Sequence, residues 1–188
     1  MTLGEIKKMA LSLIEEINPK NEYLTDDDDI KAKLNYVCNA IQIDLAQVKK
    51  ICKVYEFEKT SDITEVELPK NFYQLSKIRE ELEYEIWGNV LHFNEEYEGK
   101  VTILYYAYPS IISDETSNEY ELEIDLDAQM AMPYGIASDV LKADISSDYS
   151  IYEAKYQNMK ANLNTGKGDS ISVVDGIDLW GDFIWLLW

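Results

Sequence analysis

Hydrophobic and polar residues alternate through residues 82–109, and the other predicted elements are arranged around this segment. The alternation runs through residues 82–86, 90–93 and 101–107, with one break at Trp87-Gly88-Asn89 and a second, polar break before the last run. A period of two bounded by glycine and asparagine is typical of half-buried antiparallel strands joined by short turns. The segment therefore predicts a β-meander, with an exposed turn at Trp87-Gly88-Asn89.

Apolar residues recur at three- and four-residue spacing on both sides of the meander, which predicts four amphipathic helices. Thr2 and Glu5 match a capping box at the start of the first helix. The predicted helices span residues 2–17, 27–50, 127–143 and 147–163.

Four consecutive aspartates, at residues 26–29, lie where the second helix is expected to begin. A calcium-binding loop needs alternating oxygen ligands, a central glycine and a distal bidentate glutamate. Here the acids are consecutive and no glycine follows them. Acidic residues at a helix N-terminus accept hydrogen bonds from free N–H groups and complement the helix dipole. We therefore expect these aspartates to cap the helix rather than to bind a cation.

Together these elements predict an α+β fold: a bundle of about four α-helices, two N-terminal and two C-terminal, with an inserted antiparallel β-meander. Residues 51–57 and 63–68 have the composition of further strands, so the β-rich insertion is expected to cover residues 51–125. A chain of 188 residues can bury a proper core. We expect residues 1–163 to form a single domain and residues 164–188 to form an aromatic C-terminal tail that serves as a docking arm.

Acidic residues outnumber basic residues by 36 to 17, which gives a formal net charge of -19. Such a charge repels nucleic-acid phosphates and argues against DNA binding through a basic patch. The two cysteines, Cys38 and Cys52, are too few for a disulfide framework and indicate synthesis in a reducing compartment. Cys38 lies within an apolar helical pattern and is expected in the core. No signal-peptide pattern and no membrane-spanning apolar run is present, so no membrane partner is expected.

The sequence contains no recognisable catalytic motif. His92 is the single histidine and lies on a predicted strand, which leaves it without partners for a zinc site or a serine triad. Thr165-Gly166-Lys167 lacks the glycine spacing of a phosphate loop. A pair of carboxylates is compatible with acid–base catalysis, but with 36 acids no particular pair stands out. We therefore expect no enzymatic activity, no cofactor and no metal site.

Tryptophan is concentrated near the end of the sequence, within residues 180–188. It is the side chain most enriched at binding hot spots. An exposed aromatic segment also promotes aggregation unless it packs on its own chain or on a partner, and composition leaves both kinds of docking open. The candidate partner-interface residues are Trp87, Asn89, Trp180, Phe183, Ile184, Trp185, Leu187 and Trp188.

Five short phrases follow one another after the second predicted helix, the last of them within the third. They are VELPKNFYQL (66–75), YEIWGNVL (84–91), GKVTILYYAYP (99–109), YELEI (120–124) and MPYGIA (132–137). Their order resembles that of the head–tail connector (adaptor) proteins of tailed bacteriophages. The resemblance covers most of residues 1–163 and rests on patterning and short phrases rather than on a catalytic signature. Residues 164–188 lie outside it.

The resemblance implies a structural virion protein of the neck, assembled in the host bacterial cytoplasm. Its subunits would form a homo-oligomeric ring, a dodecamer, beneath the portal protein. The ring would extend the DNA channel and provide the attachment platform for the tail or for further neck proteins. DNA would pass through during genome packaging without specific binding, because an acidic lumen repels phosphates. The alternative is an acidic DNA-mimic or inhibitor protein that binds a basic nucleic-acid enzyme, which the net charge alone motivates.

Overall fold

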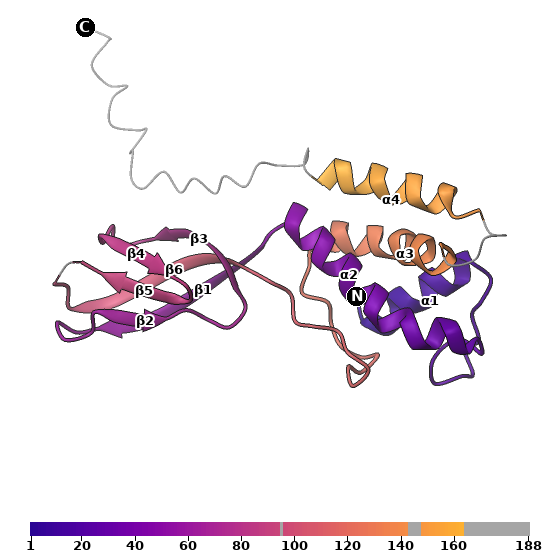
Figure 1. Ribbon diagram of the computed structural model, residues 1–188, viewed down its shortest axis with the longest axis horizontal. Helices are drawn as coiled ribbons and strands as arrows, with labels where there is room; N and C mark the ends of the chain where they lie inside the picture. The colour runs from indigo at the N-terminus through magenta and orange to yellow at the C-terminus, as the bar shows by residue number, and fades with distance from the viewer. Residues whose placement is uncertain (95, 143–147, 164–188) are drawn as a thin grey trace, which may run out of the picture.

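The computed structural model describes residues 1–94, 96–142 and 148–163. Within these residues the chain forms four α-helices and two small three-stranded antiparallel sheets, so the fold is mixed α+β (Figure 1). The helices pack on one another and the strands pair with one another, which gives a helical part and a β part side by side. In chain order the elements are α1 (Leu3–Leu13), α2 (Asp28–Val48), β1 (Ile51–Lys59), β2 (Glu65–Glu67), β3 (Phe72–Ile78), β4 (Tyr84–Trp87), β5 (Val90–Phe93), β6 (Gly99–Ala107), α3 (Leu126–Leu141) and α4 (Ser150–Leu163).

The first two helices begin with the caps that the sequence predicts. The Thr2 hydroxyl accepts a hydrogen bond from the N–H of Glu5, and the Glu5 carboxylate accepts one from the N–H of Thr2, which confirms the capping box. At the start of α2, the Asp27 carboxylate accepts a hydrogen bond from the N–H of Ile30 at 2.9 Å. Two further aspartates follow in the first turn. Asp27 therefore caps α2, as expected for this run, whereas the Asp26 carboxylate accepts hydrogen bonds from Asn18 and Asn21 in the preceding loop.

Helix α1 ends earlier than the predicted span of 2–17, which is wrong at that end. Glu15 has a left-handed backbone with φ of 61°. The N–H of Glu16 donates to the carbonyl of Leu11 at 3.0 Å, and the N–H of Glu15 donates to that of Ser12. These two bonds form a Schellman motif, which usually places glycine at the left-handed position. Because glutamate stands there instead, this helix end has no signal in the sequence.

The strands form two sheets instead of the single meander predicted over residues 82–109. Strands β4 and β5 form a hairpin, from Tyr84 opposite Phe93 to Trp87 opposite Val90, and β2 pairs with the other edge of β5. Strand β6 leaves this sheet and lies between β1 and β3. The four-residue β5 can pair less than half of the nine-residue β6, whereas β1 pairs along its whole length. Period-two alternation marks a strand but does not identify its partner.

The two sheets pack face to face as a small β-sandwich. The rings of Phe57 on β1 and Phe93 on β5 lie 6.0 Å apart, and Leu91, Val101 and Ile103 are fully buried. Because side chains alternate between the two faces of a strand, every second residue points away from this core. Strand β3, which was not predicted, lies at a sheet edge and shifts its register against β6 twice. These irregularities interrupt the alternation by which a strand is recognised.

Helix α3 is the centre of the helical part, because α1, α2 and α4 each pack against it. Met132 and Ile136 of α3 are fully buried, and Cys38 of α2 is a core residue as predicted. A Cβ atom on Gly135 would lie 3.0 Å from atoms of both Ile41 and Tyr156, so glycine permits the close approach of three helices here. Within the described ranges, no helix has both the length and the apolar character required to cross a bilayer.

Residues 108–125 lead from β6 back to the helical part (Figure 1). Glu121 forms an isolated antiparallel bridge with Thr2, at the start of α1, and Ile124 is buried in the core. The predicted β-rich insertion of 51–125 is therefore too long, because its last part pairs with the N-terminal residues and not with a sheet. The strands themselves end with β6.

Candidate interaction surface

The outer face of the β2-β5-β4 sheet combines acidic and aromatic side chains. Glu65, His92 and Glu85 lie opposite one another on the three strands, and the next row follows the same strand order. Residues directly opposite in antiparallel strands point to the same face of the sheet. We call this surface the Trp87 face. Its members are Glu65, Glu67, Glu85, Val90, His92 and Trp87.

Trp87 is the most exposed aromatic side chain of this surface, with 69% of the residue accessible. Its indole N–H donates to the Glu85 carboxylate at 3.1 Å, and its ring lies 5.9 Å from that of His92. The Nδ1 atom of His92 lies 3.3 Å from a carboxylate oxygen of Glu65. Glu85 thus contacts the N–H edge of the indole, and most of the Trp87 residue stays open to a partner.

Asn89 lies in the tight turn between β4 and β5, and its side chain already has a structural role. Gly88, beside it, has φ of 63°, a conformation that glycine adopts at little cost. The Asn89 amide donates to the carbonyl of Leu68 at 2.9 Å, and its backbone carbonyl accepts from the N–H of Leu68 at 2.9 Å. Of the two predicted partner residues at this tip, Trp87 presents free surface, whereas the Asn89 amide is bound to its own chain.

The other predicted interface residues belong to the tail and lie outside the described residues. They are Trp180, Phe183, Ile184, Trp185, Leu187 and Trp188.

The three glutamates of the Trp87 face were not predicted from the sequence. Glu65 and Glu67 come from β2, which precedes the hairpin by more than a dozen residues and reaches it only through pairing with β5. The alternation Glu65-Val66-Glu67 does indicate a strand with one acidic face. It does not indicate that this face adjoins Trp87, since that depends on strand order and register.

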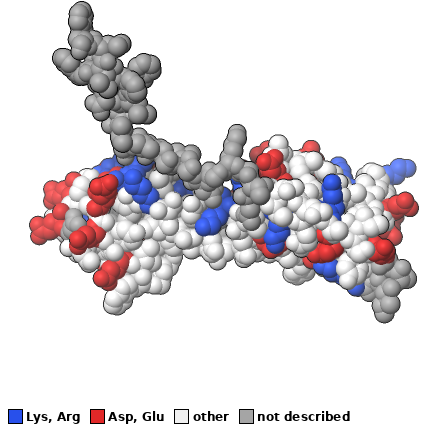
Figure 2. All heavy atoms as spheres, turned by 90° about the horizontal axis from the view of Figure 1, so that it is seen from above, with Lys and Arg blue, Asp and Glu red and all other residues white. Residues whose placement is uncertain are grey.

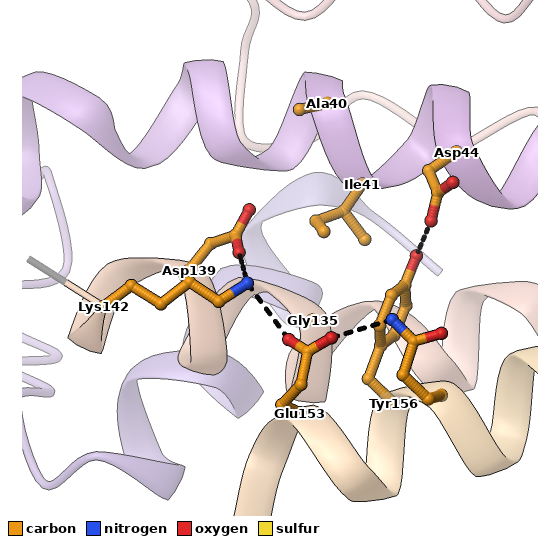
Figure 3. A pocket seen from close by; sticks show the side chains of 9 residues that line it. Ala40, Ile41, Asp44, Gly135, Asp139, Lys142, Glu153 and Tyr156 are labelled. Carbon is orange, nitrogen blue, oxygen red and sulfur yellow. Dashed lines mark hydrogen bonds and ion pairs between the residues drawn. The ribbon is translucent and has the colours of Figure 1, made fainter. Parts of the chain in front are cut away.

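A pocket of about 250 Å³ lies between α2, α3 and α4 (Figure 3). Tyr156, only 3% exposed, donates from its hydroxyl to Oδ2 of Asp44 at 2.5 Å. Lys160 donates to both oxygens of the same carboxylate at 2.6 Å. Burial, together with the hydrogen bond to Asp44, raises the pKa of Tyr156 far above its usual range.

The second cluster of charges in this pocket is centred on Glu153. Its carboxylate accepts hydrogen bonds from Gln157 and Ser138, each at 2.8 Å, and Lys142 lies 3.1 Å away. These donors, Gln157 first, lower the pKa of Glu153 to about 2. The hydrogen bond to Asp139 raises the pKa of Lys142.

The hydrogen bonds and ion pairs of this pocket join α2, α3 and α4. In the neutral range the Tyr156 hydroxyl is protonated, Glu153 is ionised and Lys142 is charged, and the shifts move each pKa further from that range. General acid–base catalysis needs a group that titrates near the working pH, and these three do not. Among the described residues, no group of three or more histidine, cysteine, aspartate or glutamate side chains is arranged to hold a metal ion.

Comparison with known proteins adds no family assignment. No protein-family model matches the chain, and no curated protein matches it. The function of the chain must therefore be inferred from its own residues and from the geometry of the Trp87 face and the helical pocket.

Proposed function

We infer that this chain is a structural virion protein, a head–tail connector that forms a ring beneath the portal of a tailed bacteriophage. The observation that carries the proposal is the Trp87 face: an exposed indole among three glutamates, on a β part that lies beside the helical part. Exposed tryptophan is characteristic of protein–protein contacts. The ordered phrases of residues 66–137 add the resemblance to adaptor proteins.

The arrangement of elements also fits this proposal. The β part is inserted between α2 and α3, so two helices precede it and two follow it. An adaptor subunit is expected to be a helical bundle that bears such a β-rich insertion. The helices would form the body of the ring, and the β-sandwich would be available to neighbouring subunits or to the next ring of the neck.

The charge distribution is consistent with a channel through which DNA slides. The net charge of -19 opposes phosphate binding, and none of the Trp87 face residues is lysine or arginine. Acidic side chains gather at the far end of the β part in the face shown in Figure 2, and they mix with lysines over the helical part. Acidic surfaces turned toward the lumen would let the genome pass without specific contacts.

Residues 164–188 are the proposed docking arm toward the portal or a neighbouring subunit. The proposal for this segment rests on its residue types, since Trp180, Trp185 and Trp188 are of the kind that dominates binding energy at interfaces. Packing of these residues on their own chain is the competing interpretation.

Reconstitution with the portal protein of the same phage tests the function. We expect the full chain to co-purify with portal rings and to add a second ring that electron microscopy resolves along the same axis. If the chain does not bind the portal and instead forms a salt-sensitive complex with a basic nucleic-acid enzyme, the proposal is overturned in favour of a DNA mimic.

A further inference from the structure

The outer face of the β1-β6-β3 sheet has a character opposite to that of the Trp87 face. Val54, Leu104 and Lys77 lie opposite one another on β1, β6 and β3. Val54 is 57% exposed and Leu104 is half-buried, so apolar surface is open at the centre of this face. Tyr106 is the β6 member of the adjacent row and is also half-buried.

Positive charge lies beside this apolar centre. The Nζ atom of Lys50 is 4.4 Å from the centre of the Tyr106 ring, and Lys77 is exposed next to Leu104. The acids of this face, Glu56 and Glu58, lie toward the other end of β1, where Lys100 forms an ion pair with Glu56 at 2.8 Å. We call this surface the Val54 face. Its defining members are Lys50, Val54, Lys77, Leu104 and Tyr106.

The two faces point in opposite directions because the sheets pack through their inner sides. One outward side of the sandwich therefore carries an indole and three glutamates. The other carries exposed aliphatic and aromatic surface beside Lys50 and Lys77, with Glu56, Glu58 and Lys100 toward the far end of β1. Complementary surfaces on opposite sides of a subunit favour head-to-tail association, which closes into a ring when the rotation between copies permits it. A two-fold dimer would instead place like charges together.

We propose that the Trp87 face of one copy docks on the Val54 face of the next copy, so that the β-sandwiches form a belt of head-to-tail contacts. The Trp87 indole covers Val54 and Leu104, and the glutamates meet Lys50 and Lys77. This inference rests on the proposed ring and identifies one of the surfaces that hold it together. The occupant is a second copy of this chain because the chain itself supplies the complementary apolar surface and charges.

The small size of this contact determines how strongly two copies associate. The strands of the Trp87 face are only three and four residues long. Contacts much smaller than a standard interface give weak pairwise association, at micromolar concentrations or above. In a closed ring each copy makes the contact twice, so assembly is stronger than one contact implies.

Charge reversal in the full chain tests the contact. One variant reverses the Trp87 face (Glu65→Lys with Glu85→Lys), and a second reverses the Val54 face (Lys50→Glu with Lys77→Glu). Sedimentation velocity over a concentration series should show self-association of the wild-type chain, weakened by roughly tenfold or more in each variant because like charges now meet. An equimolar mixture of the two variants should recover association, since every contact in an alternating assembly again joins opposite charges.

A charge-matched control separates this effect from a change in net charge. Glu16→Lys with Glu22→Lys makes the same change in charge as the Trp87 face variant, but on the helical part outside both faces, and should leave association unchanged. Circular dichroism and thermal unfolding confirm that each variant is folded. A wild-type chain that stays monomeric at all concentrations, or two face variants that associate normally, would overturn the inference.

Portal binding distinguishes the two proposals. If the face variants associate normally and still add a ring to the portal, this contact is wrong and the connector function stands. If the wild-type chain associates through these faces and never binds the portal, the contact stands and the connector function fails.

Discussion

The hydroxyl of Tyr156 on α4 donates to the carboxylate of Asp44 on α2 across 2.5 Å, and it connects two helices that otherwise touch only slightly. Lys160, one turn further along α4, binds the same carboxylate through both oxygens. A single acidic side chain of α2 therefore fixes α4 at two points, of which Figure 3 shows the bond from Tyr156, while α3 supplies most of the packing.

Tyr156→Phe should lower the free energy of unfolding by about 1.5 kcal/mol, because a hydrogen bond to a charged group is lost while the ring stays buried. Lys160 still satisfies Asp44, so the loss should remain below that of a fully unpaired carboxylate. Urea unfolding followed by circular dichroism measures the change. Tyr36→Phe on α2 is the matched control: Tyr36 is 66% exposed, and its replacement should have no effect.

Gly135→Ala should destabilise the chain by about 1–2 kcal/mol, since overpacking between three helices outweighs the better helix propensity of alanine. The added methyl would meet Ile41 and Tyr156 at 3.0 Å. Adding Ile41→Val to the variant removes one of these contacts and should restore part of the stability. An alanine variant at least as stable as the wild type in thermal unfolding would contradict this account of the helix crossing.

Glu153 should stabilise the fold at neutral pH and lose this effect in acid. Its pKa is lowered in the folded chain to about 2 from a usual 4.5. A group with a lowered pKa contributes stability that is present above pH 4.5 and disappears as the pH falls toward 2. The urea midpoint of the wild type should therefore exceed that of Glu153→Gln at pH 6, and the gap should narrow at pH 3. A gap of constant size would show that the carboxylate is not held by these donors.

Glu15→Gly should stabilise the chain by about 0.5–1 kcal/mol, because Glu15 occupies the left-handed position of a Schellman motif that glycine adopts without strain. Glu16→Gly, at the next position, serves as the control, because Glu16 is not in the left-handed region and glycine there only adds entropy to the unfolded chain. The two substitutions should thus shift the melting temperature in opposite directions.

Removing residues 176–188 should leave the described fold intact and abolish binding to portal rings. The expectation rests on the aromatic residues in this segment, which are of the hot-spot type. Circular dichroism checks the fold, and co-purification with the portal checks the binding. Alanine at Trp180, Trp185 and Trp188 should have the same effect in a chain of full length. Undiminished portal binding by the truncated chain would leave the segment without a docking role.

Local chemistry explains which parts of the fold could be predicted from the sequence. The capping residues Thr2 and Asp27 act on N–H groups a few residues away, so pattern alone locates both helix starts. The end of α1 could not be predicted because Glu15 adopts a conformation that its residue type does not suggest. The pairing of the strands could not be predicted for a different reason. Strand β6 pairs with β1 across about fifty positions in the sequence, whereas alternation describes only one strand at a time.

The same distinction applies to the candidate surface. The exposure of Trp87 is predictable, because a turn that contains glycine and joins two alternating strands places the residues beside it at an exposed tip. Its surroundings depend on the register of β2 and β5, which sets Glu65 beside His92. The helical pocket was beyond prediction for a similar reason, since Asp44 and Tyr156 meet only through the packing of helices distant in sequence.

The irregular pairing of β3 has a consequence for how copies of the chain can meet. An exposed sheet edge has unpaired N–H and carbonyl groups that can pair with a strand of another chain. Such pairing can lead to aggregation and fibrils. Here β3 shifts register twice against β6, and β2 at the edge of the other sheet is only three residues long. Neither β3 nor β2 presents a long, straight template, so main-chain pairing is discouraged at these two edges. At these two edges, recognition between copies therefore depends on side chains, which discriminate between partners, and the nine-residue β1 is left as the long regular edge of the sandwich.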